Sequence, residues 1–430
     1  MVINWQTRCF AQLLVIFAVV GMLGQSTAEA QTVEEKLALT IYRRVAGVKI
    51  GLDDARIQQM AQLIREQKME QAAAIPAEDS NFYGITVREF AAKMSNRDLV
   101  VSAPLTDFVA TIVGMARDGV DAREMLTGDF YYAADPSKVM NVPNNDVDDF
   151  LTSNNHYEFL EDNAVDLKDA LIRVDGQKLV GNAGAAVAHR DPAGVLTSRS
   201  FMAAHAIDGT NRRLVEYTFK SFTCLEINQW ADTSVSDIYV GRDVERFPEG
   251  SNNRFQATCK GCHSGMDSMR PAFALVDFDD GYLKHADLQT PVDITQRNNP
   301  DNDEVNDDEI AVDNWGVPYK FTRATDTFPE GYIVKDDSWV NLATTSKHDK
   351  LFGYRSATSG NGMGDLGKMV SESRGFSSCM VQRAFESVCK RSLKQNEDAL
   401  KRLLTDKFEG DYDLKKLFVS VASRMECVGQ

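Results

Sequence analysis

The sequence is poor in positive charge, in histidine and in cysteine. Its 47 lysines and arginines face 63 aspartates and glutamates, so the formal net charge is -16 at pH 7. Nucleic acids and anionic membranes repel such an acidic chain, which excludes both as expected partners. We also find no internal repeat, no low-complexity tract, no phosphate-binding loop and no Ser-His-Asp order. The sequence therefore gives little support to a hydrolase.

Long apolar runs are absent beyond the N-terminus. The one run there extends from Phe10 to Leu23, after the positive charge of Arg8 and before the small-x-small sequence Ala28-Glu29-Ala30. It is shorter than the roughly 20 residues that span a bilayer, which argues against a retained transmembrane anchor. The pattern predicts a Sec-type secretory signal peptide over residues 1–30. We expect the mature chain to be periplasmic or secreted, with no membrane span after cleavage.

Apolar residues recur at helical spacing in most of the remaining chain. These stripes lie in residues 33–45, 57–64, 108–115 and 414–421. The sequence Thr86-Val87-Arg88-Glu89 resembles a capping box, and Pro104 is suited to a first helical turn, so we expect helices to begin at both. Asn, Asp and Pro between Ala133 and Asp169 indicate a long surface connection. With 430 residues, the chain exceeds the roughly 250–300 residues of a single core, so we expect two or three packed subdomains.

The stretch ATCKGCHSG, residues 257–265, carries the most specific motif. Cys259 and Cys262 are separated by two residues, and His263 follows at once. In c-type haem attachment two thiols at this spacing add to the two haem vinyl groups, and the next histidine becomes the proximal iron ligand. A zinc site would need about four ligands, and no matching second pair is present. A redox-active dithiol is the other alternative, but no thioredoxin-like context surrounds it. The motif therefore predicts one covalent haem c.

Residues around this motif resemble a known family. The run RFQATCKGCHSGMDSMRPAFALVDFDDGY is similar to the haem segment of the planctomycete-type and proteobacterial cytochrome-like domain family of large exported c-type haem proteins. The matching positions are Asp267, Phe273, Ala274, Leu275, Phe278 and Asp279. Segments before and after it, including residues 103–132, 193–224 and 363–391, also resemble this family. Extra residues at Ser268 to Pro271 depart from it. The resemblance implies a haem protein but indicates no substrate.

Four other cysteines belong to the exported chain: Cys224, Cys379, Cys389 and Cys427. Disulfides are expected outside the cytoplasm. If residues 377–391 form one helix, Cys379 and Cys389 are about 15 Å apart along its axis, which is beyond the roughly 7 Å limit for bridged α-carbons. Of the two pairings that remain, we favour Cys224 with Cys379 and Cys389 with Cys427.

The sixth iron position has two candidate ligands. Met363 lies in the Gly-rich sequence SGNGMGDLG, and His205 lies in the family-like segment before the motif. A methionine thioether gives a higher potential than a second imidazole, whereas a vacant position permits peroxide or gas chemistry. The identity of this ligand therefore separates an electron carrier from an enzyme.

Together these patterns predict a mainly α protein in which several helical subdomains surround a cytochrome c-type haem site, with long irregular loops and a small β-hairpin. The expected regions are 31–190 (N-terminal helical domain), 191–290 (haem-binding), 291–350 (acidic loops, with a hairpin in 319–340) and 351–430 (C-terminal helical domain). We expect an exported monohaem cytochrome that transfers single electrons with another extracytoplasmic redox protein. The alternatives are a peroxidase-like or oxidising haem enzyme, or a structural haem in a partner-binding module.

Overall fold

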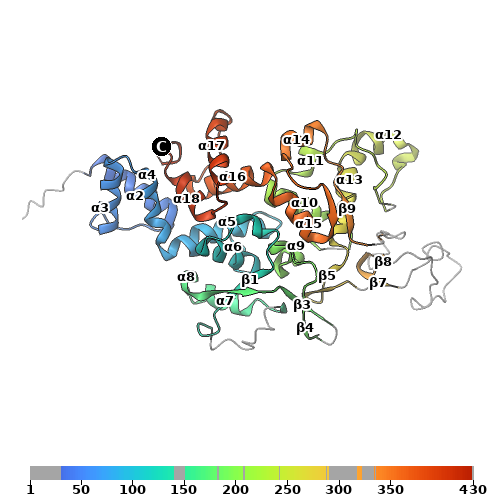
Figure 1. Cartoon of the computed structure of the whole chain (residues 1–430), viewed down its shortest axis with the longest axis horizontal. Helices are drawn as coiled ribbons and strands as arrows, with labels where there is room; N and C mark the ends of the chain where they lie inside the picture. The colour runs from blue at the N-terminus through green and yellow to red at the C-terminus, as the bar shows by residue number, and fades with distance from the viewer. Residues whose placement is uncertain are drawn as a thin grey trace, which may run out of the picture.

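The computed structural model describes residues 31–139, 151–181, 184–206, 209–241, 243–286, 288–289, 317–321, 334 and 336–428. Within these ranges the chain is mainly helical, which confirms the expected fold class (Figure 1). The predicted signal peptide and the acidic stretch 293–313 lie outside the described residues. None of the helices in the described ranges has the length and apolar character needed to cross a membrane.

The N-terminal helices follow the apolar stripes of the sequence. They are α2 (Val33–Ala46), α3 (Ala55–Arg65), α4 (Met69–Ala74), α5 (Arg88–Ser95) and α6 (Asp107–Asp118). α2 begins with a true capping box, because the Thr32 hydroxyl accepts from the Glu35 N–H and the Glu35 carboxylate accepts from the Thr32 N–H. Ile57, Met60 and Ala61 on α3 are fully buried, as their spacing predicted.

Two predicted helix starts are wrong. Thr86 does not cap a helix: it lies in the π-helical turn η2 (Phe82–Val87), and its buried hydroxyl donates to the Val45 carbonyl at 2.7 Å. The Thr86 hydroxyl, which the local pattern assigned to a helix cap, bonds instead to the neighbouring helix α2. The helix expected at Pro104 begins later, at Asp107, because Thr106 is extended and its hydroxyl accepts from the Val109 N–H.

The region 133–169 is more ordered than a surface connection. β1 (Phe130–Ala134) pairs antiparallel with β2 (Leu171–Asp175). Between them the described residues include α7 (Asn155–Asp162) and α8 (Leu167–Ala170). Tyr157 and Leu160 of α7 are buried, and α7 packs against β1. The prediction of an irregular connection is therefore wrong for the described residues after 150, because the short apolar face of α7 packs on the core.

A small sheet lies beside the residues that follow the Cys-His motif. Its strand order is β4-β3-β6-β5, from β3 (Lys178–Val180), β4 (Ala186–Ala188), β5 (Val276–Asp279) and β6 (Tyr282–His285). β3 runs parallel to β6, whereas β5 and β6 form an antiparallel hairpin. Thus the chain has a small hairpin just after the motif.

The hairpin expected in 319–340 is not formed by the described residues of that stretch. Tyr319–Phe321 is a short helix, η10, and β9 (Ser338–Val340) pairs instead with β10 (Ser359–Asn361). β8 (Val317–Pro318), just before this stretch, pairs with β7 (Leu288–Gln289).

The motif region contains several short helices. They are η6 (Gly194–Thr197), α9 (Arg199–His205), α10 (Arg212–Thr223), α11 (Ile227–Trp230), α12 (Asn252–Arg254), η8 (Phe255–Cys259), α13 (Lys260–Asp267) and η9 (Arg270–Phe273). α10 ends because Cys224 takes the left-handed conformation, with φ at 58°. α13 packs on α10, α11 and η9.

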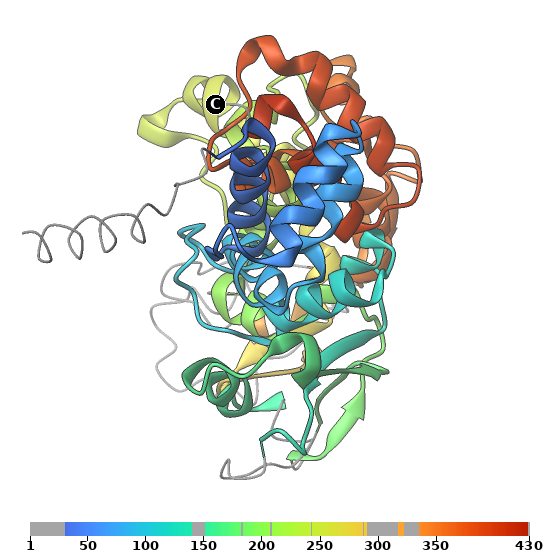
Figure 2. The same ribbon diagram turned by 90° about the vertical axis from the view of Figure 1, so that its left-hand side faces the viewer.

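The C-terminal helices close the fold against its beginning. They are α14 (Ser346–Phe352), α15 (Gly362–Ser371), α16 (Arg374–Cys389), α17 (Asp398–Phe408), α18 (Leu414–Ala422) and α19 (Met425–Val428). α18 packs on α2 and α4, and Figure 2 shows these N-terminal helices beside the C-terminal ones. One cluster of buried apolar residues extends from Ala38 to Val428. Both ends of the chain therefore share a core.

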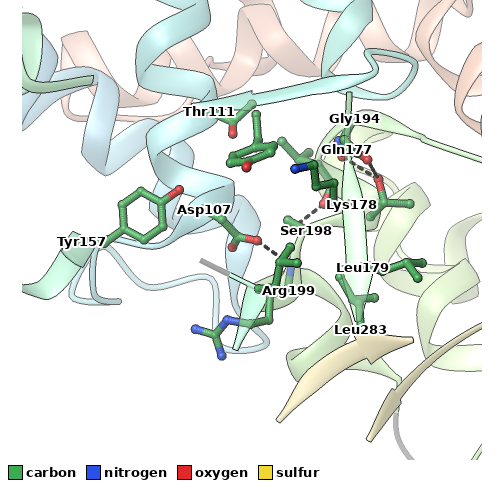
Figure 3. Close-up of a pocket in the computed structure, with 14 residues that line it drawn as sticks. Asp107, Thr111, Tyr157, Gln177, Lys178, Leu179, Gly194, Ser198, Arg199 and Leu283 are labelled. Carbon is green, nitrogen blue, oxygen red and sulfur yellow. Dashed lines mark hydrogen bonds between the residues drawn. The ribbon is translucent and has the colours of Figure 1, made fainter. Parts of the chain in front are cut away.

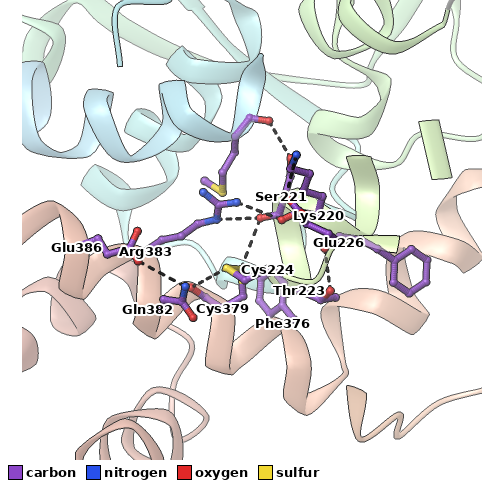
Figure 4. The surroundings of a disulfide bond; sticks show 12 residues. Lys220, Ser221, Thr223, Cys224, Glu226, Phe376, Cys379, Gln382, Arg383 and Glu386 are labelled. Carbon is purple, nitrogen blue, oxygen red and sulfur yellow. Dashed lines mark hydrogen bonds and ion pairs between the residues drawn. A yellow bond between two sulfur atoms is a disulfide. The ribbon is translucent and has the colours of Figure 1, made fainter. Parts of the chain in front are cut away.

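Two disulfides join elements far apart in sequence. Cys224 pairs with Cys379, with α-carbons 5.2 Å apart, and Cys389 pairs with Cys427 at 5.0 Å. This is the pairing favoured from the sequence, and both Cys379 and Cys389 lie on α16 as assumed. Beside the first bridge, the Arg383 guanidinium donates to the Ser221 and Lys220 carbonyls at 3.0 and 3.2 Å (Figure 4). Arg383 thereby satisfies carbonyls at the end of α10.

Candidate functional site

Cys259, Cys262 and His263 lie on one continuous helical stretch. η8 ends at Cys259, whose backbone is helical with φ -62° and ψ -42°, and α13 begins at the next residue. Side chains at positions i, i+3 and i+4 of a helix share a face. All three are partly exposed, with 25% of the His263 side chain accessible. The fold therefore brings the predicted haem-attachment residues together on an accessible face.

The opposite face of α13 is built from small residues, which let the helix sit close to its neighbours. A side-chain carbon added to Gly265 would lie 2.5 Å from the Trp230 ring, and one added to Gly261 would lie 3.2 Å from Thr233. The Asp232 N–H donates to the Gly261 carbonyl at 3.1 Å. These contacts hold α13 against its neighbours while Cys259, Cys262 and His263 stay partly exposed.

Cys259 and Cys262 are free, whereas the other four described cysteines are in disulfides. Burial, followed by the nearby charges of Glu216 and Cys259, raises the pKa of the Cys262 thiol. A raised pKa disfavours the thiolate that metal binding or thiol-disulfide exchange requires. Cys262 is thus held as a neutral thiol.

His263 is oriented by a carboxylate on its own helix. Its Nδ1 is buried, makes no hydrogen bond within the described residues, and lies 3.5 Å from Oδ1 of Asp267. Its Nε2 is not buried and has no hydrogen-bond partner among the described residues. The ring therefore has one nitrogen directed at an acidic group and the other open for a ligand.

Asp267 belongs to a buried network of two carboxylates and two guanidinium groups. Arg212 donates to its two oxygens at 2.6 and 2.8 Å, and the Gly241 N–H donates at 2.9 Å. Arg212 also binds both oxygens of Asp243, from which Arg270 lies 3.1 Å away. The side chains of Asp267, Asp243 and Arg270 are at most 1% exposed. Removal of any one member would leave the network with an uncompensated buried charge, which is energetically costly.

The network keeps its carboxylates ionised. Burial alone would raise the pKa of Asp267, but the charge of Arg270 and the hydrogen bonds and charge of Arg212 lower it well below the usual range. Burial also raises the pKa of Asp243, but the charges and hydrogen bonds of Arg270 and Arg212 outweigh it, so the pKa of Asp243 is lowered. For Arg212, the ion pairs with both carboxylates outweigh burial and raise its pKa.

The sequence did not point to Arg212, Asp243 and Arg270. Arg212 is 55 residues from Asp267 and 31 from Asp243. Arg270 is only three residues from Asp267, but in a sequence with 26% charged residues such a charge is not distinctive by itself. Asp267 was noted only as part of the family resemblance. Its spacing of four residues from His263 on a helix was a usable signal, because such pairs are neighbours.

The two candidates for the sixth iron position are both buried. His205 ends α9, stacks on Tyr217 with ring centres 4.1 Å apart, and leaves both ring nitrogens buried without a hydrogen bond. Met363 lies in the first turn of α15, where Asp191 accepts hydrogen bonds from the N–H groups of Met363 and Gly364. Within the described ranges, no three His, Cys, Asp or Glu side chains converge as a metal-ion site. Both candidates therefore remain predictions.

A separate narrow cavity lies between α6, β3 and α9, with about 520 Å³ of empty space including its open mouth (Figure 3). Its polar groups serve the fold itself: Asp107 accepts from three backbone N–H groups, and Gln177 binds the Phe130 and Gly194 carbonyls. Only Lys178 and Arg199 on its wall make no side-chain hydrogen bond or ion pair within the described chain. This cavity has fewer chemically specific groups than the motif on α13.

The donor set on α13 fits a covalently attached haem. It supplies two free thiols, one imidazole with an open Nε2, and a carboxylate beside the other nitrogen. No protein-family model matches the chain, and comparison with curated proteins and with solved structures gives no match. The prediction of a covalent haem therefore depends on the motif residues and their geometry.

Proposed function

We propose that this protein is an exported monohaem c-type cytochrome that transfers single electrons with another extracytoplasmic redox protein. Cys259 and Cys262 would form the thioether links, and the Nε2 of His263 would bind the iron. The observation that carries the proposal is the shared, partly exposed helical face of two free thiols and an oriented imidazole. When bound, haem supplies an iron that changes between the ferric and ferrous states, while the protein sets its environment.

An apolar surface beside the motif supports a role in binding a haem face or a protein partner. The loop before α12 exposes Ile238, Tyr239 and Phe247 at 75%, 50% and 61% of their surface. This loop is held against the motif helix, because Arg246 stacks over the Phe255 ring at 4.6 Å. Three exposed apolar side chains on one loop make this loop a candidate contact site.

The two disulfides fit the proposed compartment. Disulfides persist in oxidising surroundings such as the periplasm or the cell exterior. In the same surroundings two further cysteines remain free at the motif. Haem attachment would use both of these sulfurs as thioethers.

Haem attachment is tested by expressing the full chain in a bacterium that matures c-type cytochromes. The wild type should show covalent haem on a denaturing gel and the matching mass, whereas C259A/C262A should show neither. The matched control is C389A/C427A, which also removes two cysteines but leaves the motif, and should keep the haem. A secreted wild type without added haem mass would overturn the proposal.

The choice between electron carrier and enzyme is tested by the spectrum of the purified protein. A low-spin, six-coordinate spectrum that CO and cyanide leave unchanged supports electron transfer. Ready CO binding supports an enzyme with an open sixth position. Single substitutions His205→Phe and Met363→Leu identify the sixth ligand, because only loss of the true ligand changes the spin state.

A further inference from the structure

The two ring nitrogens of His263 have different surroundings. Nδ1 is buried, makes no hydrogen bond in this structure and lies 3.5 Å from Oδ1 of Asp267, whereas Nε2 is not buried. A neutral imidazole carries one proton, and the carboxylate side is where that proton is stabilised. This arrangement leaves the lone pair of Nε2 available.

Asp267 cannot turn away from this contact. Its side chain is fully buried, and its two oxygens are occupied by Arg212 and by the Gly241 N–H. Arg270, also fully buried, lies 3.9 Å from Oδ2 of Asp267 and belongs to the same network. The helix spacing of four residues and the anchored carboxylate together fix the position of the His263 ring.

Resting on the proposed function, we infer that Asp267 is the positioning residue of the proximal histidine and that it lowers the midpoint potential of the haem. A hydrogen bond from a ligating imidazole to a carboxylate fixes its tautomer and makes its other nitrogen more basic. A more basic ligand stabilises the ferric state relative to the ferrous state. The guanidinium groups of Arg212 and Arg270 beside Asp267 limit this effect without removing it.

The test compares D267N with D243N in the haem-loaded protein. Both variants remove one carboxylate from contact with Arg212 and Arg270, but only Asp267 touches His263. We expect D267N to shift the oxidation equilibrium at least tenfold toward the ferrous state, which is about 59 mV for one electron. D243N should shift it by a clearly smaller factor. Equal shifts in the two variants, or none in D267N, would overturn the inference.

Three further readouts complete the test. D267E keeps the charge and should restore most of the wild-type potential, which a purely structural role would not require. If D267N fails to fold, ring ¹⁵N NMR of the reduced wild type decides: a deshielded, slowly exchanging Nδ1 proton is expected, and a fast-exchanging one contradicts the inference. Failure of the proposed function would appear differently, as wild-type protein without covalent haem.

Discussion

At the residue scale, histidines of one sequence have opposite roles because their surroundings differ. His263 is partly exposed and faces a carboxylate, whereas His205 is buried between Phe201 and Tyr217 with no hydrogen-bond partner for either nitrogen. The motif around His263 could be read from three neighbouring residues. Asp267 could be found from its spacing of four residues, but Arg212 and Asp243 could not, because their contacts are made only by folding.

His205 gives a prediction for acid stability. Burial, with smaller contributions from Arg213 and Arg97, lowers its pKa to about 3. In the unfolded chain its pKa is about 6.5, so between these values the unfolded state binds more protons and stability falls as the pH falls. For this one group the loss from pH 7 to pH 5 is about 2 kcal/mol.

Replacing this side chain should remove that loss. Phe has a similar shape and cannot be protonated, and no hydrogen bond is lost, so H205F should be less sensitive to the change from pH 7 to pH 5. Urea unfolding at the two pH values measures it. An unchanged pH dependence would show that His205 does not remain neutral in the fold, and a changed haem spectrum would place it at the iron.

At the scale of elements, periodicity located helices better than it located their ends. The stripes at 33–45, 57–64 and 414–421 became α2, α3 and α18, whose apolar faces are buried. Helix ends depend on single side-chain hydrogen bonds, and tertiary contacts compete for these. Thr86 bonds to Val45 on another helix, and Thr106 rather than Pro104 sets the start of α6.

The close packing of α13 against Trp230 gives a prediction about stability. A methyl group at Gly265 would lie 2.5 Å from the buried Trp230 ring, whereas one at Gly261 would lie 3.2 Å from a Thr233 methyl and 3.4 Å from the Asp232 backbone nitrogen. Overpacking costs about 1–3 kcal/mol, so G265A should be destabilised by that amount and G261A by less. Thermal unfolding of the two variants checks this, and a larger loss in G261A would contradict the packing of α13 on Trp230.

At the scale of the molecule, pairings between distant segments were beyond the sequence patterns. β3 and β6 are parallel neighbours although Val180 and Lys284 are far apart in the chain. Similarly, α18 packs on α2 and α4 to close one core. The disulfides are the exception. Because Cys379 and Cys389 lie on one long helix, the sequence alone excludes a bridge between them, and the pairing it favours is the one in the structure.

The two disulfides allow a final prediction about global stability. Cys224 and Cys379 are separated by 155 residues, and Cys389 and Cys427 by 38. A bridge restricts the unfolded chain more when it closes a longer loop, by about 5 and about 4 kcal/mol for these lengths. C224A/C379A should therefore lose more free energy of unfolding than C389A/C427A in urea without reductant. Each variant removes two sulfurs from α16 or its partners, so the comparison is matched. A greater loss in C389A/C427A would show that local packing at the C-terminus, rather than loop closure, dominates.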